Sequence, residues 1–146
     1  MGLFDSFNIS ASGMTSNRYW ADLIANNVAN VNSTGRPGDP ANKPYQRQVP
    51  VFEAMLRQKL LAGTGSETRG SGVRVSRLAT DNNEPRLVYD PEHPHADPET
   101  GYVAYPNINI LNEMVNLISA TRAYEANVTT LEAAKSMYLS ALDMGR

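Results

Sequence analysis

Both ends of the chain place apolar residues at the seven-residue spacing of packed helices. From residue 110 onward one column reads Ile110, Leu117, Tyr124, Leu131 and Tyr138, and the column four residues on reads Met114, Thr121, Val128, Lys135 and Leu142. Near the start, a similar column reads Phe7, Met14, Ala21 and Val28, with Ile24 and Val31 in the companion position. Apolar residues that recur every seven positions share one face of a helix. The pattern therefore predicts two long helices, one from residue 3 or 10 to 31 and one over residues 109–142.

The second predicted helix would be roughly 50 Å long at about 1.5 Å per residue, which exceeds the width of a small domain. Ordering its backbone costs on the order of 1 to 2 kcal/mol for each of some thirty-odd residues, while burying about ten apolar side chains returns roughly 1.5 to 3 kcal/mol apiece. Such a helix is marginal alone and needs a partner. An ordinary helical hairpin within one chain and an assembly of several subunits both supply one.

Between the helices, the sequence predicts a small region of short strands. All nine prolines lie in residues 37–106, and proline disrupts helix interiors. We expect strands in YQRQVPVFEAML, VRVSRLAT, RLVYD and GYVAY, a helical turn over residues 54–61 and a flexible loop over residues 63–72. The expected fold is mainly α with a small β-rich insert, and the terminal helices pair as a coiled-coil-like hairpin. The expected divisions are residues 1–34, 35–106 and 107–146.

Polar residues mark the ends of the predicted helices. Asn107 or Asn109 can cap the second helix, and Glu113 in its first turns complements the helix dipole. Gly13 is an internal weak point of the first helix, costing roughly 1 kcal/mol against alanine.

Composition excludes several classes of protein. The formal net charge is −2, and no basic run indicates nucleic-acid or membrane-surface binding. No apolar run is long enough to span a bilayer, and the first residues lack the basic and apolar regions of a secretory signal, so these features alone predict a cytosolic protein. The chain has no cysteine, which excludes disulfides, thiol nucleophiles and thiolate metal sites.

One segment, DPEHPHADPE, has the residue types of a metal site. His93, His95 and Asp97 alternate along it and could face one divalent ion, as in a small metal-dependent hydrolase. Its prolines instead favour a stiff, solvated acidic turn, and no second cluster completes a site. We find no credible active site, so the chain is not expected to be an enzyme and no cofactor is expected. A generic coiled-coil adaptor, which would be a soluble dimer, is a further alternative.

Two terminal stretches resemble the axial proteins of the bacterial flagellum, which comprise rod, hook and hook-associated subunits. They are ANNVANVNSTG, at residues 25–35, and EMVNLISATRAYEANVTTLEAAKSMYLSALDMGR at the other end. The start LFDSFNISASGM and the run VYDPEHPHADPETGYVAYPNINILNEMV narrow the resemblance to the flagellar basal-body rod protein family. Another rod or hook-associated subunit is the alternative within this class.

The resemblance implies a structural subunit of the proximal rod, the periplasmic drive shaft and export channel, which polymerises through its paired terminal helices. It implies delivery by the flagellar type III export apparatus without a cleaved leader. The implied partners are other copies of the chain, other rod subunits, the membrane-ring/rod junction protein and the export apparatus, with no nucleic acid and no small-molecule substrate.

The resemblance also assigns residues. Those assigned to subunit assembly are Phe7, Met14, Ile24, Val28, Val31, Leu117, Ile118, Tyr124, Val128, Leu131 and Leu142. Those that carry the family motif are Asn26, Asn27, Asn30, Asn32, Arg122, Tyr124, Glu125 and Asn127.

Overall fold

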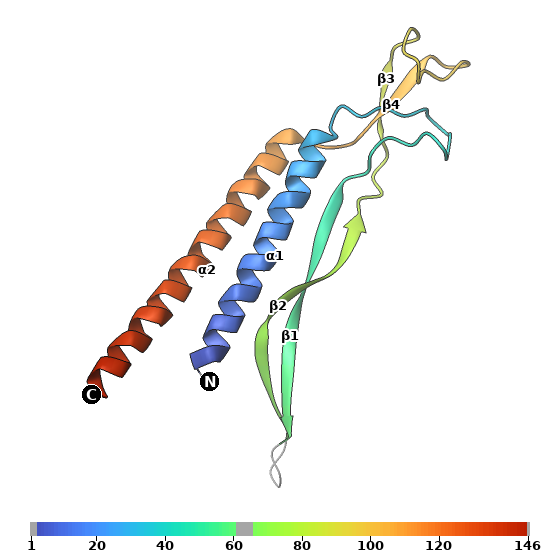
Figure 1. Cartoon of the computed structure of the whole chain (residues 1–146). Coiled ribbons are helices and arrows are strands. Elements are labelled where there is room, and N and C mark those ends of the chain that lie inside the picture. Colours follow the sequence, from blue (N-terminus) through green and yellow to red (C-terminus); the bar gives the residue numbers. More distant parts are fainter. Residues whose placement is uncertain (1–2, 61–65, 146) are drawn as a thin grey trace. The chain divides into compact units, whose positions relative to one another are not determined.

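A computed structural model describes residues 3–60 and 66–145 of the chain (Figure 1). The elements in chain order are α1 (Leu3–Ala29), β1 (Gln48–Leu60), β2 (Ser66–Thr80), β3 (Arg86–Tyr89), β4 (Tyr102–Tyr105) and α2 (Ile110–Met144). They contribute to two compact units. The first unit combines Met1–Ala21, Pro50–Arg77 and Ile118–Arg146, and the second combines Asp22–Val49 with Leu78–Leu117.

The two long terminal helices and the small antiparallel strand region between them are confirmed. Asn109 is the cap of α2, since its side-chain oxygen accepts hydrogen bonds from the main-chain N–H groups of Leu111 (3.0 Å) and Asn112 (3.4 Å). The coiled-coil form of the pairing and the three-part division at residues 34 and 106 stay predictions. No helix in the described ranges is long and apolar enough to cross a membrane.

The buried faces of the helices are built largely from small or polar residues. In α1 they include Ser10, Gly13 and Ser16, followed by Leu23, Ile24 and Asn27. In α2 the buried positions are Glu113, Ala120 and Ala134. Several large apolar side chains of the predicted columns are exposed instead, including Ile110, Met114 and Tyr138. The chain therefore uses small residues for its own helix contacts and leaves much of its apolar surface uncovered.

In the first unit, β1 and β2 form a two-stranded sheet. The helical turn predicted over residues 54–61 is wrong as far as residue 60, because β1 continues through Leu60 and residue 61 lies outside the described ranges. Pairing with β2 overrides the helix propensity of this segment. Pro50 is tolerated within β1 because each strand of a two-stranded sheet has one unpaired edge. Of the loop predicted over residues 63–72, residues 66–72 belong to β2, and the rest is outside the described ranges.

Helix α1 packs closely on three elements of the first unit, β1, β2 and α2. The Ser12 hydroxyl accepts a hydrogen bond from the main-chain N–H of Val73 (3.1 Å), and a Cβ on Gly72 would collide with the Ser12 side chain. Trp20 makes an edge-to-face contact with Phe52, with ring centroids 6.0 Å apart. A Cβ at Gly13 of α1 would lie 2.8 Å from the side-chain oxygen of Asn127 on α2. Gly13, predicted as a weak point, is thus where α1 and α2 approach each other in this unit.

In the second unit, β3 and β4 form an antiparallel hairpin in which Arg86 pairs with Tyr105 and Tyr89 with Tyr102. Gly35 extends this sheet, because it exchanges two main-chain hydrogen bonds of 2.9 Å with Ala104. A Cβ at Gly35 would collide with main-chain atoms of Asn42 and Pro44, so only glycine fits. Val103 and Ala104 are buried. The chain leaving α1 is therefore fixed to β4, a few residues before α2 begins.

Candidate functional site

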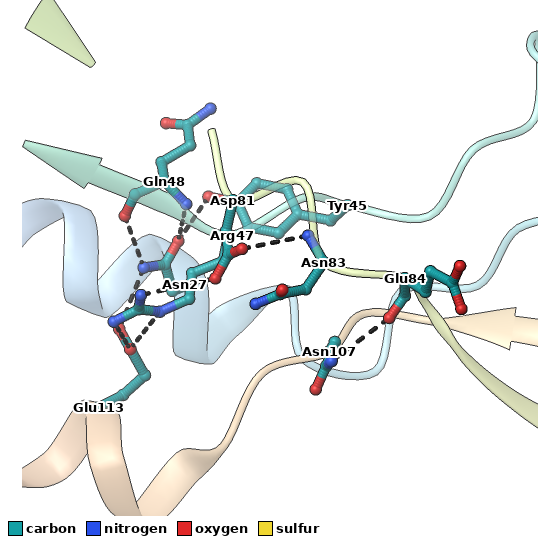
Figure 2. A network of polar contacts seen from close by, with 9 residues as sticks. All are labelled: Asn27, Tyr45, Arg47, Gln48, Asp81, Asn83, Glu84, Asn107 and Glu113. Atoms are coloured by element: carbon teal, nitrogen blue, oxygen red, sulfur yellow. Dashed lines mark hydrogen bonds and ion pairs between the residues drawn. The ribbon is translucent and has the colours of Figure 1, made fainter. Parts of the chain in front are cut away.

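The side-chain amide of Asn27 lies at the centre of a buried polar cluster in the second unit (Figure 2). Its nitrogen donates to the main-chain carbonyl of Gln48 (2.9 Å) and to a carboxylate oxygen of Glu113 (3.0 Å). Its oxygen accepts from the main-chain N–H of Gln48 (3.0 Å) and from the Tyr45 hydroxyl (3.0 Å). Both donors and both acceptor positions of the amide are occupied. The Asn27 amide bonds both the main-chain N–H and the carbonyl of Gln48, as a peptide group of a neighbouring strand would.

Glu113 brings a carboxylate into the same cluster from the first turns of α2, and it is 1% exposed. One of its oxygens accepts from two nitrogens of Arg47, Nε at 2.8 Å and a terminal nitrogen at 2.7 Å, and the other accepts from Asn27. Arg47 also lies 3.9 Å from Asp81. Burial of a carboxylate is tolerated when it is paired and fully hydrogen-bonded, as it is here. Its place near the start of α2 adds a favourable interaction with the helix dipole.

Tyr45 completes the cluster from the segment before β1. Burial, followed by the nearby negative charge of Glu113, raises the pKa of the Tyr45 phenol. The phenol therefore stays protonated at neutral pH and remains a donor to Asn27. The cluster joins the last turns of α1, the start of β1 and the start of α2.

The cluster is suited to holding chain segments together rather than to catalysis. The Glu113 carboxylate is engaged by both Arg47 and Asn27, and the Tyr45 hydroxyl is used in a hydrogen bond to Asn27. Within the described ranges, no group of three or more histidine and acidic side chains is placed to hold a metal ion.

The predicted metal segment forms a turn between β3 and β4. His93 accepts a hydrogen bond from the main-chain N–H of His95 (3.0 Å), and the His95 ring is 2.8 Å from the Thr34 hydroxyl. Asp97 accepts from the Thr100 hydroxyl (2.6 Å), and this bond, ahead of weaker contributions, lowers the Asp97 pKa. These contacts fit the stiff-turn interpretation of the segment.

The structure places the predicted assembly residues at three levels of exposure. Ile24 is buried. The half-buried residues are Phe7, Met14, Val28, Val31, Leu117, Val128 and Leu131. The exposed residues are Ile118, Tyr124 and Leu142. Their role in assembly stays a prediction.

The family-motif residues also differ in their surroundings. Asn27 enters the cluster, whereas Asn26 and Asn32 are exposed, and Asn30 bonds to the main-chain oxygen of Asn26 (2.9 Å). Arg122 and Glu125 form an exposed ion pair of 2.8 Å beside exposed Tyr124 on α2. Asn127 donates to the carbonyl of Ala123 (2.8 Å) and faces Gly13. The motif thus marks one buried structural centre and several surface positions.

Sequence reasoning missed Arg47 and Tyr45 and gave Glu113 only a helix-dipole role. One signal was available. Glu113, Ala120, Asn127 and Ala134 form a seven-residue column on α2 that is buried or half-buried. The apolar periodicity of the sequence does not mark this column, because its residues are small or polar.

Comparison with known proteins gives the family. The family described as Flagellar basal body rod FlgEFG protein C-terminal matches residues 99–144. The protein named Flagellar basal-body rod protein FlgC of Borreliella burgdorferi is 42% identical over 150 residues, covering 97% of each chain. Proteins of the same name from Bacillus subtilis and Escherichia coli O6:H1 are 39% and 37% identical, and each alignment covers 100% of both chains. The chain therefore belongs to the FlgC family of flagellar basal-body rod proteins.

Proposed function

We propose that the chain polymerises into the proximal rod through the helix faces that its own fold leaves uncovered. The family is structural, so the protein is a non-enzymatic subunit located in the rod of the flagellar basal body. We further propose that the assembled subunits enclose the inner export channel and transmit rotation as part of the drive shaft.

The observation that carries this proposal is the apolar surface of α2. In the second unit, α2 exposes Leu111 (76%) and Met114. In the first unit it exposes Ile118 (62%), Met137 and Leu142. Scattered exposed apolar residues are ordinary, but repeated exposure of large ones along a single helix indicates an interaction surface.

The energy available from this surface is large for a repeated contact. Burying each large apolar side chain contributes roughly 1.5 to 3 kcal/mol, so a few per subunit suffice to drive association. The small residues on the inner faces of α1 and α2 strengthen the case, because the chain reserves its larger side chains for the outer faces. Partner helices from neighbouring subunits would cover them.

The expected partners follow from this mode of assembly. Copies of the same chain and other rod subunits would present similar helices, and the subunit at the base would meet the membrane-ring/rod junction protein. Delivery by the type III export apparatus belongs to the same proposal, since the rod lies beyond the inner membrane.

A double substitution on the exposed face of α2 tests this proposal. Ile118→Ser with Leu142→Ser should leave the isolated chain folded, because both side chains are exposed. The variant should nevertheless be absent from purified basal bodies, and the cells should not swim. Thr129→Ser with Ala133→Ser is the matched control at exposed positions of the same helix and should swim normally. Normal incorporation of the first variant would show that this face is not an assembly surface.

A further inference from the structure

A pocket of about 350 Å³ lies in the second unit, close to the buried cluster. Five prolines line it, among them Pro37, Pro44 and Pro106. Proline holds its φ angle and offers no N–H donor, so these walls are stiff and mostly apolar. Preformed, mainly apolar pockets with a few polar groups are typical of binding sites.

Five charged residues line this pocket: the basic Arg36, Lys43 and Arg47, and the acidic Asp39 and Asp81. The Nε atom of Arg36 is buried and has no hydrogen-bond partner among the residues that the structure describes. A buried donor without an acceptor is costly, and a guanidinium binds carboxylates best. Lys43 lines the same pocket and is exposed to solvent. Arg47, by contrast, is engaged by Glu113 and also lies 3.9 Å from Asp81.

Asp39 and Asp97, whose pKa values the charge of Arg36 helps to lower, use their hydrogen bonds elsewhere. Asp39 accepts from the main-chain N–H of Ala41 (2.9 Å) and from the Asn42 side chain (2.7 Å), and these bonds lower its pKa more than the charge of Arg36 does. Asp97 is bonded to Thr100. Neither forms an ion pair with Arg36 in the described part of the chain. The pocket thus presents a cation that lacks a direct anionic partner.

The turn between β3 and β4 has the complementary charge. Residues 90–99 contain Asp90, Glu92, Asp97 and Glu99 and no lysine or arginine, and three prolines stiffen them. Glu92 and Glu99 are exposed. Among the other acidic residues, Glu53 is paired with Arg74 and Glu125 with Arg122.

We propose that the acidic turn of a second copy of this chain, led by Glu92, docks in the pocket of Arg36 and Lys43. None of residues 90–99 lines the pocket. The contact therefore joins two different surfaces and is head-to-tail, and repeated head-to-tail contacts generate an open helical filament. Stiffness on both sides reduces the ordering cost of docking. This inference rests on the proposed assembly into a rod.

Cross-linking tests the contact directly, because the chain has no native cysteine. The double variant Lys43→Cys with Glu92→Cys, as the cell's only copy, should give a ladder of dimers, trimers and larger products when basal bodies are treated with a short bis-maleimide. Neither single variant should form a ladder, and Lys43→Cys with Glu132→Cys should form none. A product linked within one chain, or unlinked monomer in intact basal bodies, would overturn the inference.

A charge exchange provides the second measurement. Arg36→Glu and Glu92→Arg should each lower the yield of rods by about tenfold or more, because like charges then face each other. The two changes combined should restore most of the yield. Unchanged yield in the single variants, or no recovery in the combination, would contradict the contact. Absence of the unaltered chain from purified basal bodies would instead contradict the proposed function itself.

Discussion

At the scale of single residues, the position of Asn27 demands an amide. A carboxylate of the same shape could not donate to Gln48 or to Glu113, and it would add a second negative charge where the present nitrogen is 3.0 Å from the Glu113 oxygen. An alkyl side chain would leave the Gln48 main-chain groups unpaired. The cluster therefore distinguishes asparagine from the residues closest to it in size.

We predict that Asn27→Asp lowers the free energy of unfolding by about 3 kcal/mol or more, because it breaks buried hydrogen bonds and brings two carboxylates together. Chemical denaturation at neutral pH measures this loss. Asn26→Asp, one residue earlier and exposed, is the matched control and should change the free energy by about 0.5 kcal/mol or less. Equal effects of the two substitutions would show that the cluster contributes little to stability.

At the scale of single residues, sequence rules predict some members of the buried cluster and its surroundings but not others. The family motif points to Asn27, and the rule for helix caps, which acts within four residues, narrows the cap of α2 to Asn107 or Asn109. The partners of Asn27 could not be identified in this way, because Arg47 and Glu113 become neighbours only when distant parts of the chain fold together. A polar side chain in sequence gives no sign of whether it will be buried and paired.

At the scale of elements, the approach of α1 and α2 depends on Gly13. The side chain of Asn127 occupies the space that a Cβ at this position would need. Glycine at this position lowers the helix propensity of α1 but allows the close contact between the two helices.

We predict that Gly13→Leu destabilises the first unit by about 1 to 3 kcal/mol, since an added side chain must push Asn127 or the helix aside. Ala11→Leu, at an exposed position of the same helix, should be close to neutral. Thermal unfolding monitored by circular dichroism compares the two. If Gly13→Leu proved as stable as the control, the close approach would be unnecessary for folding.

Long helices and short strands differ in how well sequence predicts them. Both ends of α2, the end of α1 and the earlier of its two expected starts agree with the structure within a few residues, because periodicity and caps are local signals. The extension of β1 to Leu60 was missed because EAMLRQKL is composed of helix-forming residues and only β2 makes it a strand. Periodicity of apolar residues does not mark the buried face of α2, because the residues of that face are small or polar.

At the scale of the whole molecule, burial is unevenly distributed along α2. Ala134 is buried, whereas residues 135–145 are exposed. Without partners, this part of the helix has little tertiary packing to hold it, and isolated helical segments of such length are marginal.

We predict that hydrogen exchange in the dilute, isolated chain is fast in α2 beyond residue 134 and slow around Asn27 and Glu113. In assembled rods the same amides should become protected, since neighbouring subunits would cover them. Mass spectrometry of the two samples measures the change. Strong protection through Met144 in the isolated chain would mean that α2 needs no neighbours.

The hydrogen bond between Asn27 and Glu113 also affects when the second unit can fold. The two residues are 86 positions apart in the chain. In a polypeptide delivered from its amino end, Asn27 and Arg47 arrive long before their carboxylate partner does, and such distant contacts form late. The second unit then cannot close until most of the polypeptide has passed. The second unit would therefore remain unfolded during export and would fold only after Glu113 had also been delivered.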